Sequence, residues 1–172
     1  MRYRRLGVLA ALWLAAAMMP QAGMAQSDPV NPPAPGIGDA VTFIDEDDEP
    51  VATVNLVSVE RDWASYNASH TPAEDTDYLA LTVEVEGLPD SPGVEIARED
   101  FALQVDPGVL VEVAGVRSDT ADPPLLRGSI DVEEGDVVAF TLVYEIPTGT
   151  PVAHLFWTPG DAFLTVAELD GE

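Results

Sequence analysis

Five consecutive acidic residues are the sharpest chemical feature of this 172-residue sequence. They are Asp45, Glu46, Asp47, Asp48 and Glu49, and Pro50 follows them directly. Carboxylates on one short loop repel one another, and a hard cation such as Ca²⁺ relieves that repulsion. The spacing departs from an EF-hand loop, because the required glycine and the closing bidentate Glu are missing. The run predicts either a calcium site or a solvated hairpin tip whose charges block edge pairing.

A second group of chemically capable side chains lies in the longest predicted loop, residues 62–77. The loop carries Trp63, Tyr66, Asn67 and His70. Such side chains on a loop at the end of a rigid scaffold are typical of recognition surfaces, so these four are the predicted binding residues. The alternative is that Trp63 and Tyr66 fold back as a lid on the core. Asn67 also begins an Asn-Ala-Ser sequon, which we attribute to chance in an exported bacterial protein.

Catalytic constellations do not stand out. The sequence has two His, at positions 70 and 154, and a shared metal site would need the loop to fold onto the strand of His154. No Ser-His-Asp order is persuasive, and paired carboxylates are too abundant to single out a glycosidase pair. No glycine-rich phosphate loop occurs. The sequence therefore predicts a non-enzymatic protein with no cofactor other than the calcium of the alternative above.

These loops must be held by β-strands, because the hydrophobic period is two. Residues 78–86 place Leu79, Leu81, Val83 and Val85 on one face, and residues 136–146 form a second long strand. Weaker strands are predicted at 41–44, 51–61, 101–105, 109–116, 126–132, 153–157 and 162–169. The phase changes near Val57, which indicates a bulge. Residues 94–100 are expected to make one helical turn.

The strand count and the regular turn signals predict an all-β fold. We expect a single immunoglobulin-like antiparallel β-sandwich of about seven to eight strands over residues 40–172. Residues 26–39 contain four prolines and two glycines, and we expect a flexible, unpacked leader there.

The first 25 residues have the features of a secretory signal peptide. Arg2, Arg4 and Arg5 precede an apolar stretch of 14 residues, 6–19, and small residues at 23 and 25 suit a signal peptidase. The stretch is short of the roughly 20 residues that span a bilayer, which disfavours the alternative of an uncleaved anchor. Cleavage after residue 22 or 23 is a further alternative. No Cys follows the stretch, so we predict a secreted or periplasmic protein without a lipid anchor.

Composition excludes several classes of function. The chain has a formal charge of −24, no Cys, and four Met that all lie in the first 25 residues. Removing that segment leaves four Arg against 31 acidic residues, a charge of −27 and no sulfur atom. Disulfides and soft-metal ligation are then excluded, and nucleic acid and anionic membranes are poor partners. The acidity fits solubility in high salt or a genome that favours Arg over Lys.

Three segments carry a resemblance to a known family. They are Tyr-Leu-Ala-Leu-Thr-Val-Glu-Val from residue 78, Asp-Phe-Ala-Leu from residue 100, and the stretch 135–147 that opens with a turn glycine and closes with Pro147. They resemble the bacterial extracellular immunoglobulin-like domains grouped with the secreted mycobacterial immunoprotective antigens. The family usually has an Asn after the first strand, where this chain has Gly87-Leu88-Pro89. The resemblance implies a fold and an extracytoplasmic location, and no activity.

The leading hypothesis is therefore a soluble, acidic, exported accessory domain. It would bind an extracytoplasmic protein or surface ligand through a loop at the end of the sandwich, or through a sheet edge or face. The second hypothesis is a calcium-binding or salt-adapted structural module centred on residues 45–49.

Overall fold

Alternating apolar residues give the chain ten strands within residues 33–106 and 108–169, the part that this computed structural model describes. The predicted signal peptide, residues 1–25, lies outside the described residues, as does the first part of the predicted leader. The first sheet has four antiparallel strands in the order β1-β2-β3-β8. Their bounds are β1 (Ala40–Ile44), β2 (Pro50–Glu60), β3 (Thr76–Gly87) and β8 (Val137–Pro147).

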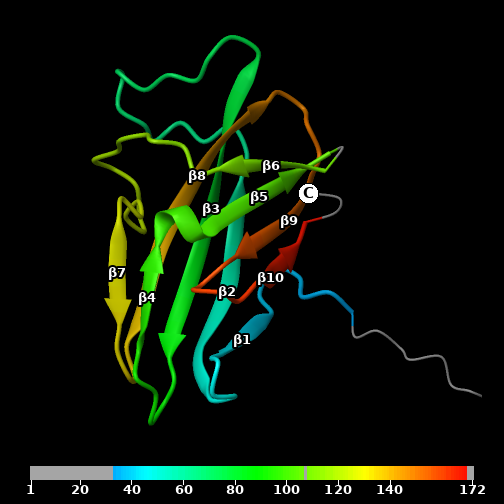
Figure 1. Cartoon of the computed structure of the whole chain (residues 1–172). Coiled ribbons are helices and arrows are strands. Elements are labelled where there is room, and N and C mark those ends of the chain that lie inside the picture. The colour runs from blue at the N-terminus through cyan, green and yellow to red at the C-terminus, as the bar shows by residue number, and fades with distance from the viewer. Residues whose placement is uncertain (1–32, 107, 170–172) are drawn as a thin grey trace, which may run out of the picture. The chain divides into compact units, whose positions relative to one another are not determined.

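The second layer is built from two separate pieces. The larger is an antiparallel sheet in the order β10-β9-β5-β6, and the smaller is the two-stranded ribbon β4-β7. Their bounds are β4 (Val94–Ala97), β5 (Phe101–Val105), β6 (Val109–Glu112), β7 (Ser129–Val132), β9 (Val152–Trp157) and β10 (Leu164–Glu168). A single 3₁₀ turn, Arg98–Asp100, joins β4 to β5. Figure 1 shows the larger sheet lying across the long strands of the first sheet.

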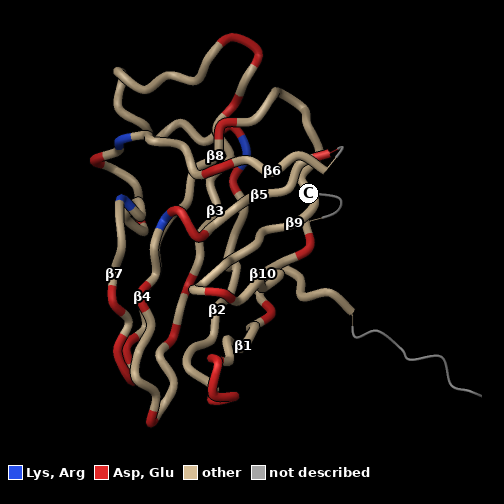
Figure 2. Tube along the Cα trace, viewed as in Figure 1, with Lys and Arg blue, Asp and Glu red and all other residues tan. Residues whose placement is uncertain are grey.

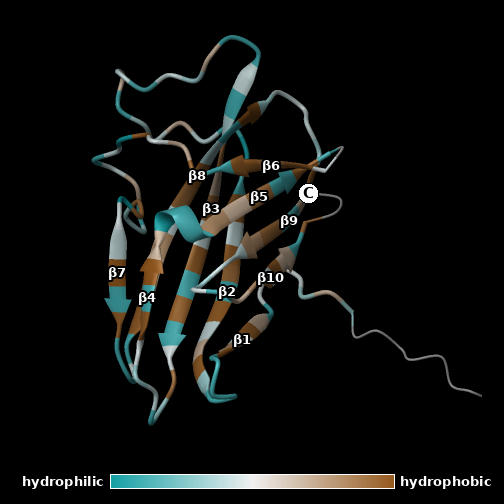
Figure 3. Ribbon diagram, in the orientation of Figure 1, coloured by the Kyte–Doolittle hydropathy of each residue, from teal (hydrophilic) through white to brown (hydrophobic). Residues whose placement is uncertain are grey.

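The core lies between the two layers. Side chains alternate across a strand, so Leu79, Leu81 and Val83 of β3 point inward and are at most 1% exposed. Phe101 of the second layer stacks on the fully buried Trp157, with ring centroids 6.0 Å apart. The apolar strands and polar turns of Figure 3 follow the same division. Without disulfides, burial of this surface is the main source of stability.

The predicted all-β sandwich is confirmed, and so is the bulge in β2. The β2–β3 register skips between Leu56 and Ser58, which leaves Val57 unpaired and 44% exposed. The helical turn expected over residues 94–100 is wrong for its first half. Residues 94–97 are extended and pair with β7, because β-branched Ile96 is buried on the core side of an extended strand. The structure has ten strands in its described residues where about seven to eight were expected, and β4 is one that the sequence did not predict.

The described part of the leader is not unpacked. The N–H of Gly38 donates to the carbonyl of Leu56 in β2 at 2.8 Å. The carbonyl of Pro35 accepts the N–H of Glu168 in β10 at 2.7 Å. Proline cannot donate a backbone hydrogen bond, but its carbonyl still accepts one, so a proline-rich segment can cover a strand edge.

The outer edge of β8 is covered by the long connection between β6 and β7. Within that connection, Ala114 N–H donates to Val143 O, and Leu126 N–H donates to Thr141 O. Thr141 N–H in turn donates to Pro124 O, and an isolated parallel bridge joins Leu125 to Thr141. Within the described residues, no helix has the length and apolar character needed to cross a membrane.

A candidate ligand-binding groove

The aromatic residues of the 61–75 loop form a lid on the outer face of the first sheet. Trp63 is 4% exposed and clusters with Tyr78, Ala80 and Val143. Tyr66 lies between, with its ring 6.2 Å from Trp63 and 5.2 Å from Tyr78. The sequence left two alternatives for Trp63, a binding residue or part of a lid. The structure favours the lid, because a buried ring cannot form part of a contact surface.

The remaining predicted binding residues of this loop are engaged within the molecule. Asn67 uses its N–H to donate to Arg117 O and its side-chain amide to donate to Asp119 Oδ2, at 2.8 and 3.1 Å. Ser118 donates its hydroxyl to the carbonyl of Ser65. The ring of His70 bonds to the adjacent Ser69 hydroxyl. The bonds of Asn67 and Ser118 hold the loop against the β6–β7 connection.

Glu145 anchors the far end of the same loop. Its Oε1 accepts hydrogen bonds from Ala73 N–H and from the Thr76 hydroxyl, each at 2.7 Å. Those two bonds favour the carboxylate and lower the pKa of Glu145 below its ordinary value of 4.5. The loop is therefore held at both ends, which suits a lid and not a mobile recognition loop.

The acidic run forms the tip of the β1–β2 hairpin. Asp45 Oδ1 accepts the N–H groups of Asp47 and Glu49 at 2.9 and 3.0 Å, so this carboxylate stabilises the turn. Asp48 adopts φ = 63°, a conformation that Asp tolerates better than most residues. Within the described residues, no group of three or more His, Cys, Asp or Glu side chains is placed to hold a metal ion.

His154 lies on the outer face of β9, away from the loop that carries His70. Its Nδ1 bonds to Gln104 Oε1 at 2.9 Å, and its ring stacks on Phe156. Phe156 contacts Phe163, which is 65% exposed. The structure does not bring the two His together, and His154 has an amide partner instead of an acid.

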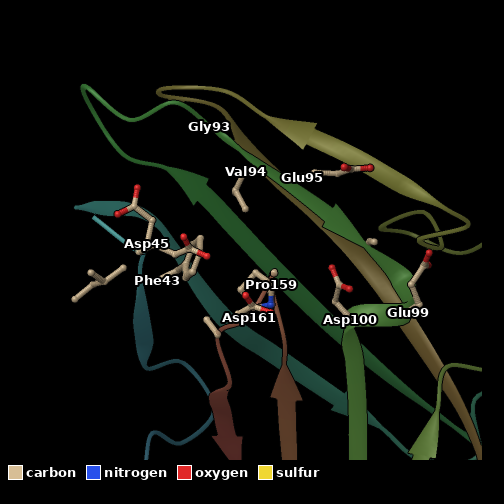
Figure 4. Close-up of a pocket in the computed structure, with 14 residues that line it drawn as sticks. Phe43, Asp45, Gly93, Val94, Glu95, Glu99, Asp100, Pro159 and Asp161 are labelled. Atoms are coloured by element: carbon tan, nitrogen blue, oxygen red, sulfur yellow. The ribbon is translucent and has the colours of Figure 1, made fainter. Parts of the chain in front are cut away.

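A cavity opens where the second layer is interrupted. It measures about 770 Å³ and lies between β4, the tip of β1, the 3₁₀ turn and the β9–β10 turn. We call it the acidic groove. Its lining residues are Phe43, Ile44, Asp45, Glu46, Gly93, Val94, Glu95, Ala97, Glu99, Asp100, Pro159, Gly160, Asp161 and Ala162. Figure 4 shows carboxylates projecting from both walls around Phe43, Val94 and Pro159.

The floor of the acidic groove rests on the core. Phe43 packs edge-on against Trp157, with ring centroids 5.4 Å apart. One end is fixed by Thr158, whose N–H and hydroxyl both donate to Asp100 O at 2.9 Å. A groove supported in this way is already formed before a ligand binds. Ordering of the groove would therefore cost little binding free energy.

The electrostatics of the acidic groove are one-sided. Six of its lining residues are acidic, and among the fourteen described residues that line it none is Lys, Arg or His. Burial raises the pKa of Asp100 above its ordinary value of 3.8, the Ala97 N–H opposes that shift, and Glu99 and Glu95 add to it. A cation placed among these groups would relieve the repulsion between them. Figure 2 shows acidic residues on the β4-β7 ribbon and on the hairpin tips around it.

Sequence reasoning found two residues of the acidic groove, Asp45 and Glu46, and assigned them to a calcium loop. The others were missed because they come from four segments that only the folded chain brings together. A usable signal was present in Glu95, Glu99 and Asp100, which lie within the helical turn predicted over residues 94–100.

Comparison with solved structures identifies proteins that have a similar fold. The secreted protein MPT63 of Mycobacterium tuberculosis aligns with 81% of this chain and 98% of its own, at a TM-score of 0.59 and 14% identity. The chain shares its fold with a secreted mycobacterial protein. The yjhA protein of Bacillus subtilis aligns with 79% of this chain and 99% of its own, at a TM-score of 0.58 and 16% identity. The resemblance predicted from the sequence is confirmed at the level of the fold.

A third structure contains the fold as one part of a longer chain. The candidate lipoprotein ycdA of Bacillus subtilis aligns with 77% of this chain, which spans 38% of that protein, at a TM-score of 0.55 and 16% identity. No family model matches the chain, and no curated protein matches it either. None of these three proteins is named for an activity.

Proposed function

We propose that this chain is an exported, non-enzymatic binding module that holds a positively charged ligand in its acidic groove. The observation that carries the proposal is the combination of a preformed cavity of about 770 Å³, an apolar floor and a rim of carboxylates. Recognition sites of this kind combine apolar contact with a few placed polar groups. The formal charge of −24 would also steer a cationic partner toward the molecule.

The residue types in the acidic groove support binding in preference to catalysis. Among the described lining residues there is no Ser, Thr, Cys, His, Tyr or Lys, so the groove has no hydroxyl, thiol or amine nucleophile and no imidazole base. None of the three fold neighbours described above is named as an enzyme. The partner we expect is an extracytoplasmic protein or surface ligand, and not nucleic acid.

Neutralising the rim is expected to weaken binding of a cationic probe about tenfold, since each exposed ion pair contributes a fraction of a kcal/mol. The variant combines Glu95→Gln, Glu99→Gln and Asp161→Asn. Isothermal titration with spermine and with a lysine-rich peptide measures the affinity, which should also fall as NaCl rises.

The matched control carries the same charge change outside the acidic groove. It combines Glu84→Gln, Glu86→Gln and Glu134→Gln, three exposed positions, and should bind as the wild type does. Equal losses of affinity in both variants would show that the overall charge of the protein, and not the acidic groove, determines binding. No binding of either probe to the wild type would remove the proposed function.

We propose that the module works outside the cytoplasm, as the amino-terminal sequence and the secreted neighbour MPT63 support. Pulse-chase labelling offers a direct test, because all four Met lie before residue 26 and the chain has no Cys. Label from sulfur-containing amino acids should appear in the precursor and vanish from the protein as it matures. A labelled protein that persists in the envelope would instead indicate an uncleaved anchor.

The calcium alternative for residues 45–49 makes a different prediction. Since Asp45 already caps its own turn, we expect Ca²⁺ to raise the melting temperature no more than Na⁺ does at matched ionic strength. Thermal melts of the wild type and of Asp47→Asn in both salts make the comparison. A larger rise with Ca²⁺ that Asp47→Asn abolishes would establish the calcium site in place of plain screening.

A further inference from the structure

Strand β4 has a partner on one edge and none on the other. It pairs with β7 alone, through Val94↔Val132, Glu95↔Asp131, Ile96↔Ile130 and Ala97↔Ser129. The opposite edge belongs to the wall of the acidic groove, because Val94, Glu95 and Ala97 all line the cavity. Figure 4 shows Val94 and Glu95 along the strand that borders the cavity.

The phase of the β4–β7 ladder identifies the backbone groups that face the acidic groove. Arg98 N–H donates to Gly128 O at 3.0 Å, in the same register as Ile96↔Ile130 and Val94↔Val132. In an antiparallel ladder, hydrogen-bonded pairs alternate with pairs whose backbone groups point away. The N–H and C=O of Glu95 therefore point to the other edge, where no described residue pairs with them.

An unpaired strand edge is a template for an added strand, and natural proteins usually cover such edges. Two other edges of the described strands are covered in this way. The β6–β7 connection covers β8, and Pro35 bonds to β10. The Glu95 edge stays open and borders a preformed cavity, which is the arrangement used by domains that bind peptides through strand addition.

We propose that the acidic groove accepts an extended, lysine- or arginine-rich peptide segment, which pairs with Glu95 of β4 as an added strand. This inference rests on the proposed function and names its ligand class. Alternate side chains of such a peptide would point to opposite faces. One set would lie on Phe43, Val94 and Pro159, and the other would reach the carboxylates of the rim.

Charge complementarity selects this occupant over a neutral or acidic strand. Glu95 and Glu99 stand on one wall, Asp45 and Asp161 on the other, so a basic side chain meets a carboxylate on either side. Like charges placed there would cost binding energy. A polyamine could satisfy the carboxylates but cannot make the two backbone bonds at Glu95.

The test uses the full exported chain and a fluorescein-labelled peptide of alternating lysine and valine, about eight residues long, slightly more than a typical strand. Two further peptides are N-methylated, one at every lysine and the other at every valine. Strand pairing along one edge needs the N–H groups of one set only. We expect one methylated peptide to bind about tenfold more weakly and the other to bind as the parent does.

Variants of the protein provide the second arm. Glu95→Pro removes the N–H that faces the acidic groove and leaves the hydrogen bonds to β7 intact. It should weaken binding of the parent peptide more than Glu95→Gln does. Circular dichroism reports whether Glu95→Pro folds, and the methylated peptides test the wild type whatever that result is. A peptide with glutamate in place of lysine should not bind.

Two results would overturn the inference while the proposed function stands. One is equal binding of the parent and both methylated peptides, and the other is spermine binding as tightly as the peptide through the same carboxylates. Failure of every cationic probe would instead remove the proposed function itself.

Discussion

Replacing Trp63 by alanine is expected to lower the free energy of unfolding by about 3–5 kcal/mol, the range for truncating a buried large aromatic side chain. The ring is 4% exposed and packs with Tyr66 and Tyr78, at centroid distances of 6.2 and 6.4 Å. Its loss would open a cavity beneath the loop and uncover the outer face of β3 and β8. Domains of this size are stable by about 5–15 kcal/mol, so the variant would lose a large part of its stability.

Urea titration followed by circular dichroism measures this effect. The matched control is Phe163→Ala, which truncates an aromatic side chain that is 65% exposed and should change stability by less than about 1 kcal/mol. Fluorescence of the fully buried Trp157 reports whether the main core remains intact in Trp63→Ala. Equal effects of the two substitutions would contradict the structural role of the loop. A loss of ligand binding without a loss of stability would return Trp63 to the binding surface.

The second large effect is expected at Gly87, at the end of β3. A Cβ added there would lie 2.0 Å from the carbonyl oxygen of Glu133 and 2.9 Å from its carbon. Both neighbours are backbone atoms of the turn before β8, and the same turn bonds to both backbone groups of Gly87, through Asp136 O and Gly135 N–H. Gly87→Ala should therefore cost about 3 kcal/mol, at the upper end of the range for overpacking.

Gly128→Ala is the control for backbone freedom. No atom lies within 4 Å of the position that its Cβ would take, so this substitution should leave the melting temperature unchanged or raise it slightly. Equal changes in melting temperature for the two substitutions would show that a lack of space does not explain the glycine at position 87.

Local sequence patterns predicted the strands that carry their own signal. The alternation in β3 is long and regular, and the phase change at Val57 was enough to place the bulge in β2. The strand β4 was missed because it is four residues long, and its partner β7 lies more than 30 residues further along the chain. A short strand of that kind is specified by tertiary pairing and not by its own periodicity.

The candidate site was less predictable than the fold, for a related reason. An acidic residue on a hairpin tip and another beside a 3₁₀ turn are each ordinary surface residues when taken alone. Asp45, Glu95 and Asp161 become one rim only because β1, β4 and the β9–β10 turn meet around a cavity. The aromatic residues of the 61–75 loop had the stronger sequence signal and proved to pack inward, because large apolar rings gain more from burial than from exposure.

The covered edge of β8 limits how copies of this molecule can join. A fibre grows only if each unit offers two open edges, one for the preceding copy and one for the next. In the first sheet, the hydrogen bonds that Ala114 and Leu126 donate to β8, and the one that Pro124 accepts from it, occupy the middle of one terminal strand. This leaves β1 as the open edge at the other end of the sheet. Two copies joined through β1 would form a closed pair, and that sheet could not propagate further. The covered edge of β8 thereby opposes polymerisation of this molecule along its longest strands.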